Sequence, residues 1–304
     1  MAPSGYAWWY LDALSDDGQH GLTIIGLVGS VFSPFYAASR RKGRTNPLAH
    51  CSMNVAVYGP KRNAWAFTER GGMDVRRYRT ALVIGPSSME WENDVFTVRF
   101  EEKTAPLPGR ISGTVRIHPV TLGEDKPFVL DEKGRHRWGP IAPIARAEVE
   151  LRRPGNIRWN GLAYVDTNAG SEPLEDGFSS WNWCRTTTKD RMIVTYDAFR
   201  RSGSRHIIQH AFHANGETNS VEPLVERSLA RTRWGLSRSM RVDPRSSARL
   251  VRTLEDTPFY SRSEVVGSYV GQYARGVHES LSLDRWKSRI VQFMLPYRMR
   301  REAR

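Results

Sequence analysis

The stretch Asp94–Glu102 reads DVFTVRFEE and indicates the class of fold. Apolar side chains recur at every second position, at Phe96, Val98 and Phe100, whereas the intervening positions, such as Arg99, point the other way. A period of two is the spacing of a β-strand with one buried face. This stretch therefore predicts a strand whose two phenylalanines face a core.

The same period recurs along most of the chain. Further strand-like runs lie at residues 52–58, 111–117, 147–151, 191–199, 206–213, 248–254 and 265–273. Gly-Pro, Pro-Gly and Asn-Gly pairs separate these runs, as expected of turns. Helical patterns are nearly absent, and a short helix is expected only around Asp74–Leu82. Many short strands with regular turns are typical of a sandwich or barrel, so we expect an all-β fold.

The length of 304 residues favours two domains, since about 150 residues suit one barrel. The strongest boundary signal is RRPGN at Arg152–Asn156, where Pro and Gly follow a clear strand. We therefore expect two β-barrels side by side, at residues 1–154 and 155–304, with a basic tail on the second.

The chain is strongly basic, with a net charge of +13 from 45 Lys and Arg against 32 Asp and Glu. Two basic segments adjoin apolar sequence. They comprise Arg40, Arg41, Lys42 and Arg44, and then Arg285, Lys287, Arg289, Arg298, Arg300, Arg301 and Arg304. Such segments suit an anionic membrane surface, and a solvated charge is the alternative. Nucleic acid ranks last among partners, because no nucleic-acid-binding motif accompanies the charge.

The uncharged stretch Gly21–Ala38 approaches the length of a membrane span. Its several Gly, Ser and Pro residues make a poor spanning helix, so we expect a buried strand and then a loop after Ser33-Pro34. The N-terminal sequence shows no positively charged segment and no cleavage pattern of a secretory signal. We therefore expect a peripheral protein on the cytoplasmic side of the membrane.

The sequence lacks the motifs of several common classes of enzyme and binding protein. The sequence contains no phosphate-binding loop, no GxGxxG after a strand and no GxSxG. His206, His210 and His213 have a metal-like spacing, but a strand would place the third on the opposite face from the first two. Cys51 and Cys184 lack the spacing of a zinc site. We expect no metal and no cofactor.

Two short motifs pair a titratable group with an aromatic ring. GRHRWGPIAP places His136 and Trp138 two residues apart, and YVDTNAG places Tyr164 and Asp166 two apart. In an extended chain each pair points to one side. Without further evidence these residues also have a purely structural interpretation. Trp138 and Tyr164 would then be core residues, His136 a surface residue, and Asp166 the cap of a turn.

Stretches from one end of the chain to the other resemble a known family. They are GYAWWYLDALSDDGQHGLTIIGLVGSVFSPFY, NVAVYGP, TERG, HRWGPIAP, YVDTNAGSEPLEDGFSSWNW, LEDTPFYSRS and HESLSLDRW. The sequence resembles the carotenoid 1,2-hydratases, also called hydroxyneurosporene synthases, of purple phototrophic bacteria. The resemblance implies two lipocalin-like β-barrels and a cofactor-free hydro-lyase of carotenoid biosynthesis in photosynthesis. It also implies an acyclic carotenoid substrate, such as neurosporene or lycopene, and a catalytic set of His136, Trp138, Tyr164 and Asp166.

The chemistry explains these residue types. Hydrating an isolated alkene requires a protonated acid, a stabiliser for the tertiary carbocation and a held water beside a base. Asp166 can be the acid where burial keeps it protonated. Trp138, with Trp181 or Trp183, offers a π-face to the cation. His136 can hold the water and take its proton, and the sequence leaves open whether Asp166 or His136 gives the first proton.

Two other functions fit the same fold. A lipocalin-like barrel can carry an apolar polyene without changing it, because a fold does not fix a function. An isomerase or cyclase would also proceed through a cation. Turnover separates the carrier from the enzymes, and a mass gain of one water separates the hydratase from the isomerase or cyclase.

Overall fold

The computed structural model describes residues 1–44 and 46–302. Thr45, Ala303 and Arg304 lie outside the described residues, so the expectation for Arg304 in the basic tail is left aside. The chain is built mainly of β-strands, which confirms the predicted all-β class. It divides into two compact units, Met1–Pro173 with Phe293–Arg304, and Leu174–Gln292.

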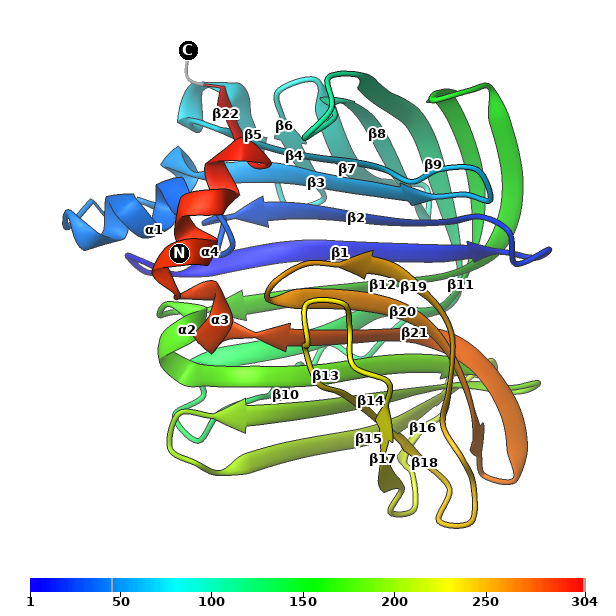
Figure 1. The fold of residues 1–304 in the computed structure, drawn as a ribbon. Coiled ribbons are helices and arrows are strands. Elements are labelled where there is room, and N and C mark those ends of the chain that lie inside the picture. Colours follow the sequence, from blue (N-terminus) through cyan, green and yellow to red (C-terminus); the bar gives the residue numbers. More distant parts are fainter. Residues whose placement is uncertain (45, 303–304) are drawn as a thin grey trace. The chain divides into compact units, whose positions relative to one another are not determined.

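The first unit holds one large sheet (Figure 1). Its strands run in the order β22-β4-β3-β2-β1-β12-β11-β9-β8-β7-β6-β5, and β10 pairs with β11. The elements are β1 (Tyr6–Ser15), β2 (Gly21–Val28), α1 (Pro34–Arg41), η1 (Pro47–Ala49), β3 (Cys51–Tyr58), β4 (Ala64–Arg70), η2 (Gly72–Asp74), β5 (Val75–Arg77), β6 (Ala81–Ile84), β7 (Ser87–Glu92), β8 (Val95–Lys103), β9 (Arg110–Thr121), β10 (Phe128–Val129), β11 (His136–Arg153), β12 (Ile157–Gly170), η3 (Leu295–Tyr297) and β22 (Arg300–Glu302).

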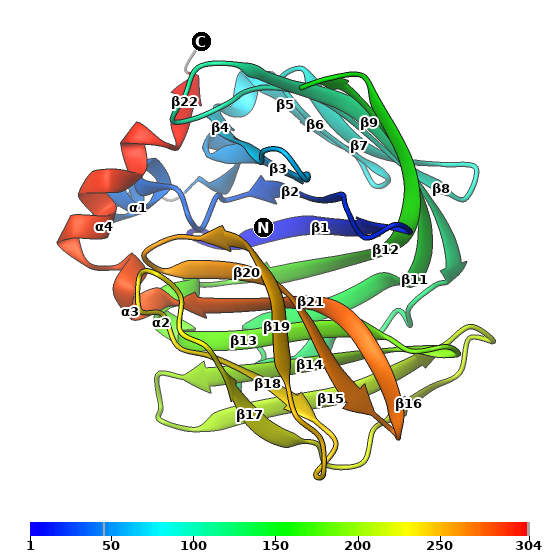
Figure 2. The same cartoon turned by 45° about the vertical axis from the view of Figure 1, so that its right-hand side comes forward.

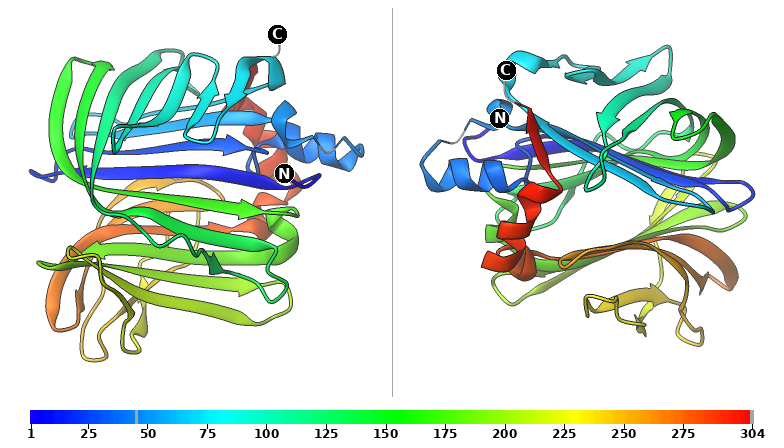
Figure 3. Two further views of the ribbon diagram at one scale, coloured as in Figure 1. Left: turned by 180° about the vertical axis from the view of Figure 1, so that it is seen from behind. Right: turned by 45° about the horizontal axis from the view of Figure 1, so that its top comes forward.

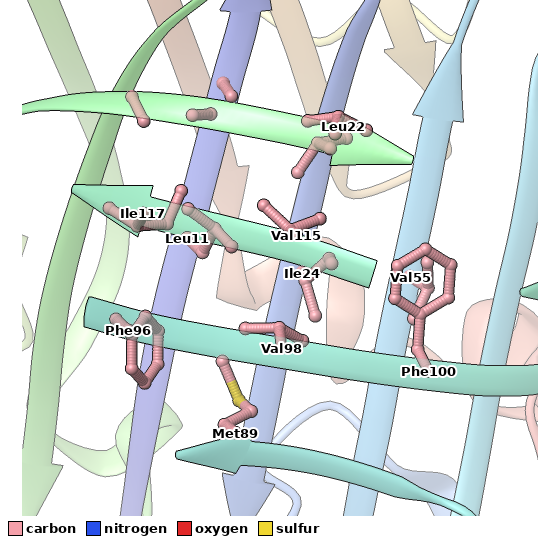
Figure 4. Close-up of a cluster of buried hydrophobic side chains, with 14 of the residues drawn as sticks. Leu11, Leu22, Ile24, Val55, Met89, Phe96, Val98, Phe100, Val115 and Ile117 are labelled. Carbon is pink, nitrogen blue, oxygen red and sulfur yellow. The ribbon is translucent and has the colours of Figure 1, made fainter. Parts of the chain in front are cut away.

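This sheet curls so that β3 and β4 contact β8 across the interior (Figure 2). Phe96, Val98 and Phe100 are buried there, on the face that the alternation predicts. Figure 4 shows them among apolar side chains of the opposing strands, including Leu11 and Val55. One face of the curled sheet thus forms a continuous core.

The second unit holds a seven-stranded sheet in the order β16-β15-β14-β13-β21-β20-β19, and a separate β17-β18 hairpin (Figure 3). Its own core includes Cys184, Ile193 and Val265. Its elements are α2 (Leu174–Gly177), β13 (Phe178–Thr187), β14 (Arg191–Arg200), β15 (Arg205–His213), β16 (Thr218–Ser220), β17 (Val225–Leu229), β18 (Arg238–Val242), β19 (Arg249–Asp256), β20 (Tyr260–Tyr269), β21 (Gln272–Ser282) and α3 (Leu283–Trp286), and α4 (Arg289–Met294) follows at the division between the units.

The expected boundary at Arg152–Asn156 differs from the observed division. This segment is the turn of the β11–β12 hairpin, and both strands belong to the first sheet. The units divide after Pro173 instead. Pro-Gly after a strand marks any reverse turn, and only the pairing of β12 with β1 shows that the first unit continues.

Two local expectations are corrected. The segment after Ser33 is the helix α1 rather than a loop, because the Ser33 hydroxyl accepts from the backbone amides of Phe35 and Tyr36 and Pro34 begins the helix. The short helix expected at Asp74–Leu82 is mostly the β5–β6 hairpin.

The C-terminal segment is ordered into elements rather than a plain tail. After α4 and η3, β22 pairs in parallel with β4 in the first sheet. Glu302 lies 3.2 Å from the Arg70 guanidinium and 2.9 Å from Lys103. Of the helices within residues 1–44 and 46–302, none is long and apolar enough to cross a membrane.

Candidate active site

Two neighbouring strands, β11 and β12, bring the predicted catalytic residues to one face of the first sheet (Figure 1). Trp138 lies opposite Asn168, and this alternation places His136, Trp138, Tyr164 and Asp166 on the same side. The neighbouring positions of opposite parity, such as Val165, join the apolar core. The set therefore lies on the face of the sheet that points away from the core of the first unit.

The Asp166 carboxyl is buried, with only 4% of the residue exposed. Its Oδ2 accepts hydrogen bonds from Trp138 Nε1 at 2.8 Å and from the Tyr164 hydroxyl at 2.9 Å. Both donors are neutral.

Tyr164 is suited to remain a donor. Burial raises the pKa of Tyr164 well above its usual range, and the charges of Asp166 and Asp12 raise it further. The phenol therefore keeps its proton at neutral pH and holds the Asp166 carboxyl in one orientation.

His136 is fully buried and fixed on several sides. Its Nδ1 is 2.9 Å from the Tyr6 hydroxyl, its Nε2 is 3.3 Å from Glu172, and its backbone N–H donates to Asp131. Burial lowers the pKa of His136, although Asp131 and Glu172 oppose this shift. The imidazole is therefore mainly neutral near pH 7.

His136 and Asp166 occupy different rows of the same face. His136 is opposite Gly170, four residues from Asp166 along β12, which is about 13 Å at the rise of a strand. Trp138 lies between the two rows and donates to Asp166. Hydrogen bonds thus join Trp138, Tyr164 and Asp166 into one group. His136 lies on the same face of the sheet but outside this group, further along the strand direction.

The two predicted substrate-binding tryptophans belong to the second unit. Trp181 and Trp183 lie two apart on β13, on the opposite face from Cys184 of that unit's core. Both are largely buried, and the Trp181 ring lies 6.1 Å from that of Tyr196.

Sequence reasoning missed a second buried carboxyl at this site. Asp12 on β1 is completely buried, and its Oδ2 accepts from the Tyr10 hydroxyl at 2.7 Å. The register places Asp12 opposite Tyr164. The available signal was the spacing Tyr10-Leu-Asp12, which repeats the Tyr-x-Asp spacing of the motif at Tyr164.

A pocket of about 510 Å³ opens beside β1 in the first unit. Its lining includes Trp8 and Trp9 from β1, and Arg77, Arg79 and Leu82. Trp9 packs against the core, whereas Trp8 lies on the same face of β1 as Asp12. None of the four predicted catalytic residues is among the described lining residues of this pocket.

The three histidines with metal-like spacing lie on a strand, as predicted. His206 and His210 share one face of β15, and His213 lies on the other, where its Nε2 is 2.7 Å from Asn219 Oδ1. Across the described ranges 1–44 and 46–302, no group of three or more His, Cys, Asp or Glu residues could hold a metal ion.

Solved structures with the same fold define the class of protein. An AttH-type protein of Nitrosomonas europaea superposes with a TM-score of 0.63 at 16% identity, over 91% of this chain and 92% of that one. Kievitone hydratase of Nectria haematococca gives 0.60 at 11% identity, over 94% and 92%. Likeness at such identities shows the fold, which is that of the lipocalin-like β-proteins.

Closer relatives show the family. The model of the carotenoid hydratase CrtC family matches residues 24–304. The acyclic carotenoid 1,2-hydratase of Thiocapsa roseopersicina is 47% identical over 99% of this chain and 74% of its own length. That of Cereibacter sphaeroides is 38% identical over 91% and 98%. The chain belongs to the carotenoid hydratase CrtC family, which confirms the family expected from the sequence.

Proposed function

We propose that this protein is a cofactor-independent acyclic carotenoid 1,2-hydratase, which adds water across the terminal C1–C2 double bond of its substrate. Neurosporene would give hydroxyneurosporene, and lycopene would give rhodopin. Membership of the family supports the reaction. The observation that carries the mechanism is the buried Asp166 carboxyl, which is held by the neutral donors Trp138 and Tyr164.

Asp166 gives the first proton in this proposal. The proton is added to the less substituted alkene carbon, C2, and leaves a tertiary cation at C1. His136 is a poor candidate for this step, since burial lowers its pKa and leaves it mainly neutral near pH 7. A buried carboxyl among neutral donors is the stronger proton source.

The cation is stabilised by aromatic faces and by the carboxylate that Asp166 becomes. The Trp138 N–H is engaged with Asp166, which fixes the indole beside the reacting carbons. A desolvated cation–π contact contributes about 2 kcal/mol, or roughly thirtyfold in rate. Trp181 and Trp183 are proposed to contact the long polyene chain of the substrate.

Water then adds at C1 and loses a proton. The Asp166 carboxylate formed in the first step takes this proton back, because C1 and C2 are bonded neighbours. His136 lies about 13 Å from Asp166 along the strand direction, so its neutral imidazole, whose ring is fixed by Tyr6 and Glu172, is too far away to take the proton directly. One water is consumed, and no redox partner is needed.

Incubation of the purified protein with lycopene in liposomes, without added cofactor, tests this function. A hydratase gives a product heavier by one water. A carrier returns lycopene unchanged, and an isomerase or cyclase gives a product of equal mass. Activity should also survive dialysis against a chelator, and loss that zinc restores would contradict cofactor independence.

Peripheral contact with the cytoplasmic side of the inner membrane is part of the proposal, since the substrate is an apolar polyene. Ile290, Phe293 and Tyr297 are 74%, 70% and 70% exposed, at helical spacing along α4 and η3. Basic residues flank this stripe at Arg289 and Arg298. Exposed aromatic residues beside arginines suit the interface of an anionic bilayer.

Sedimentation with anionic liposomes tests this contact. Wild-type protein should pellet at low salt and be largely released at high salt, because each basic residue near the surface contributes only about 1 kcal/mol and is screened. The double variant Phe293→Ser, Tyr297→Ser should bind less, whereas Leu107→Ser, at a 78% exposed position elsewhere, should not. Equal binding of all three proteins would contradict the contact.

A further inference from the structure

The pocket of about 510 Å³ in the first unit has lining residues of two kinds. Val28 and Leu82 are apolar and buried, at 2% and 4% exposed. Arg77, Tyr78 and Arg79 also line the pocket, and all three are exposed to solvent. None of the described lining residues is acidic. The pocket therefore has a buried apolar side and an exposed side with two positive charges.

Strands β1 and β2 supply most of the apolar side. In their register Ala7 lies opposite Val28 and Trp9 lies opposite Gly26, and all four residues line the pocket. Trp9 is only half-buried, and its ring packs edge-on against Phe96 of the core with centroids 6.0 Å apart. This core contact fixes the indole, so the apolar side is a preformed surface against which a hydrocarbon chain can pack.

The β5–β6 hairpin, at the edge of the first sheet, supplies the cationic side (Figure 1). The backbone amide of Tyr78 donates to the Ala81 carbonyl at 2.8 Å, which closes the turn that carries Arg79. Arg77 is the cross-strand partner of Leu82, and cross-strand partners point to the same side of a sheet. Because Leu82 packs in the apolar side, the Arg77 side chain leaves the hairpin on the pocket side.

The two arginines of the pocket are available for a ligand. Within residues 1–44 and 46–302, the structure shows no ion pair and no side-chain hydrogen bond for Arg77 or Arg79. Guanidinium groups bind carboxylate and phosphate through charge-assisted hydrogen bonds. A free phosphate would leave the apolar side empty, and an uncharged polyene would give the arginines no partner. A molecule with an anionic head and a hydrocarbon chain matches both sides.

We propose that this pocket binds an anionic amphiphile. Its carboxylate or phosphate lies on Arg77 and Arg79, and the exposed Tyr78 hydroxyl is a further donor beside them. Its alkyl chain packs against Trp9 and Val28. The inference goes beyond the proposed hydratase function, because none of the four predicted catalytic residues is among the described lining residues. Free fatty acids and the phospholipids of a membrane share this chemistry.

Titration calorimetry below the critical micelle concentration tests the site without turnover. The probes are decanoate, decanoyl lysophosphatidylglycerol and neutral decanol, which share one chain, and inorganic phosphate, which has none. Both chain-bearing anions should bind, and the tighter of the two identifies a free fatty acid or a membrane phospholipid as the source. Decanol and inorganic phosphate should bind about tenfold more weakly or less, because each lacks one half of the interaction. Decanol that binds as tightly as decanoate, or no binding of either chain-bearing anion, would overturn the proposal.

Variants locate the binding in this pocket. The double variant Arg77→Gln, Arg79→Gln should weaken both chain-bearing anions about tenfold and leave decanol unchanged. Ala7→Phe fills the apolar side and should weaken all three chain-bearing probes. The matched control Arg116→Gln, Arg152→Gln removes two exposed arginines of β9 and β11 and should bind like the wild type. Equal affinity of the two arginine double variants for decanoate would overturn the proposal, and this comparison uses only exposed positions, so it holds even where Ala7→Phe fails to fold.

Discussion

Asp166 on β12 and Asp197 on β14 are buried to the same degree, 4% exposed each, but they have different partners. Asp197 accepts from Arg205 at 2.8 Å and from Arg241 at 2.7 Å. Asp166 accepts from an indole and a phenol. Guanidinium ions favour the carboxylate form, whereas neutral donors leave a carboxyl able to keep its proton. Burial alone therefore does not make an acid, and in the proposed mechanism the indole and phenol donors distinguish Asp166 from the arginine-paired Asp197.

The comparison predicts opposite consequences for the same substitution at the two sites. Replacing Asp166 with Asn should mainly lower the rate of the reaction. Replacing Asp197 with Asn should mainly lower the free energy of unfolding. Removing one member of a buried ion pair leaves the other charge uncompensated, which is costly. A donor such as an indole carries no such charge.

The largest effect is expected for Asp166→Asn. Because the amide has no proton to give, kcat for lycopene hydration should fall by about 100-fold or more, the usual range for a general acid. The free energy of unfolding should change much less. Product mass analysis and denaturant unfolding of the same preparation measure both quantities, and turnover near the wild-type rate would remove Asp166 from the role of acid.

Asp197→Asn should give the reverse result. The free energy of unfolding should fall by about 3–5 kcal/mol, because the buried Arg241 loses its counter-charge, whereas the exposed Arg205 keeps Glu226 as a partner. The folded fraction should keep its kcat. Urea titration followed by tryptophan fluorescence measures the stability, and a variant as stable as the wild type with reduced kcat would break the comparison.

A smaller effect is expected from His278, which is fully buried in the second unit, with its Nε2 donating to the Ser239 carbonyl at 2.7 Å. Burial lowers the pKa of His278 from 6.5 to about 4. The unfolded chain then binds the proton more readily, so stability is complete above pH 6.5 and is lost as the pH falls toward 4. The loss should reach about 3 kcal/mol, at about 1.4 kcal/mol per pKa unit.

Denaturant unfolding of wild type and His278→Gln between pH 7 and pH 4 checks this prediction. The variant should show a flatter dependence of stability on pH in that window. Parallel curves for the two proteins would show that His278 does not carry the acid sensitivity.

Local pattern predicted much of the fold. The alternation around Phe96 gave the buried face of β8, and the spacing of His136 with Trp138 and of Tyr164 with Asp166 correctly placed each pair on one face. These inferences needed only the period of a strand. The end of the first unit depended on the pairing of β12 with β1, which no single segment reveals.

The same limit explains why Asp12 was missed. Its segment, WWYLDA, reads as an aromatic strand, and the significance of the aspartate depends on cross-strand register with Tyr164. Register is a property of two strands together. The helix α1 is a different case, because the sequence itself contains the signal for it. A serine followed by proline, as at Ser33-Pro34, is typical of the start of a helix, but the segment was predicted to be a loop.

Hydration of lycopene in heavy water tests most directly the claim that a protonated Asp166 starts the reaction. After exchange into D₂O, the wild-type product should carry one carbon-bound deuterium at C2 together with the new oxygen at C1, and Asp166→Asn should give no labelled product above background. A wild-type product that lacks deuterium at C2, or an Asp166→Asn variant that forms the labelled product at the wild-type rate, would contradict the account.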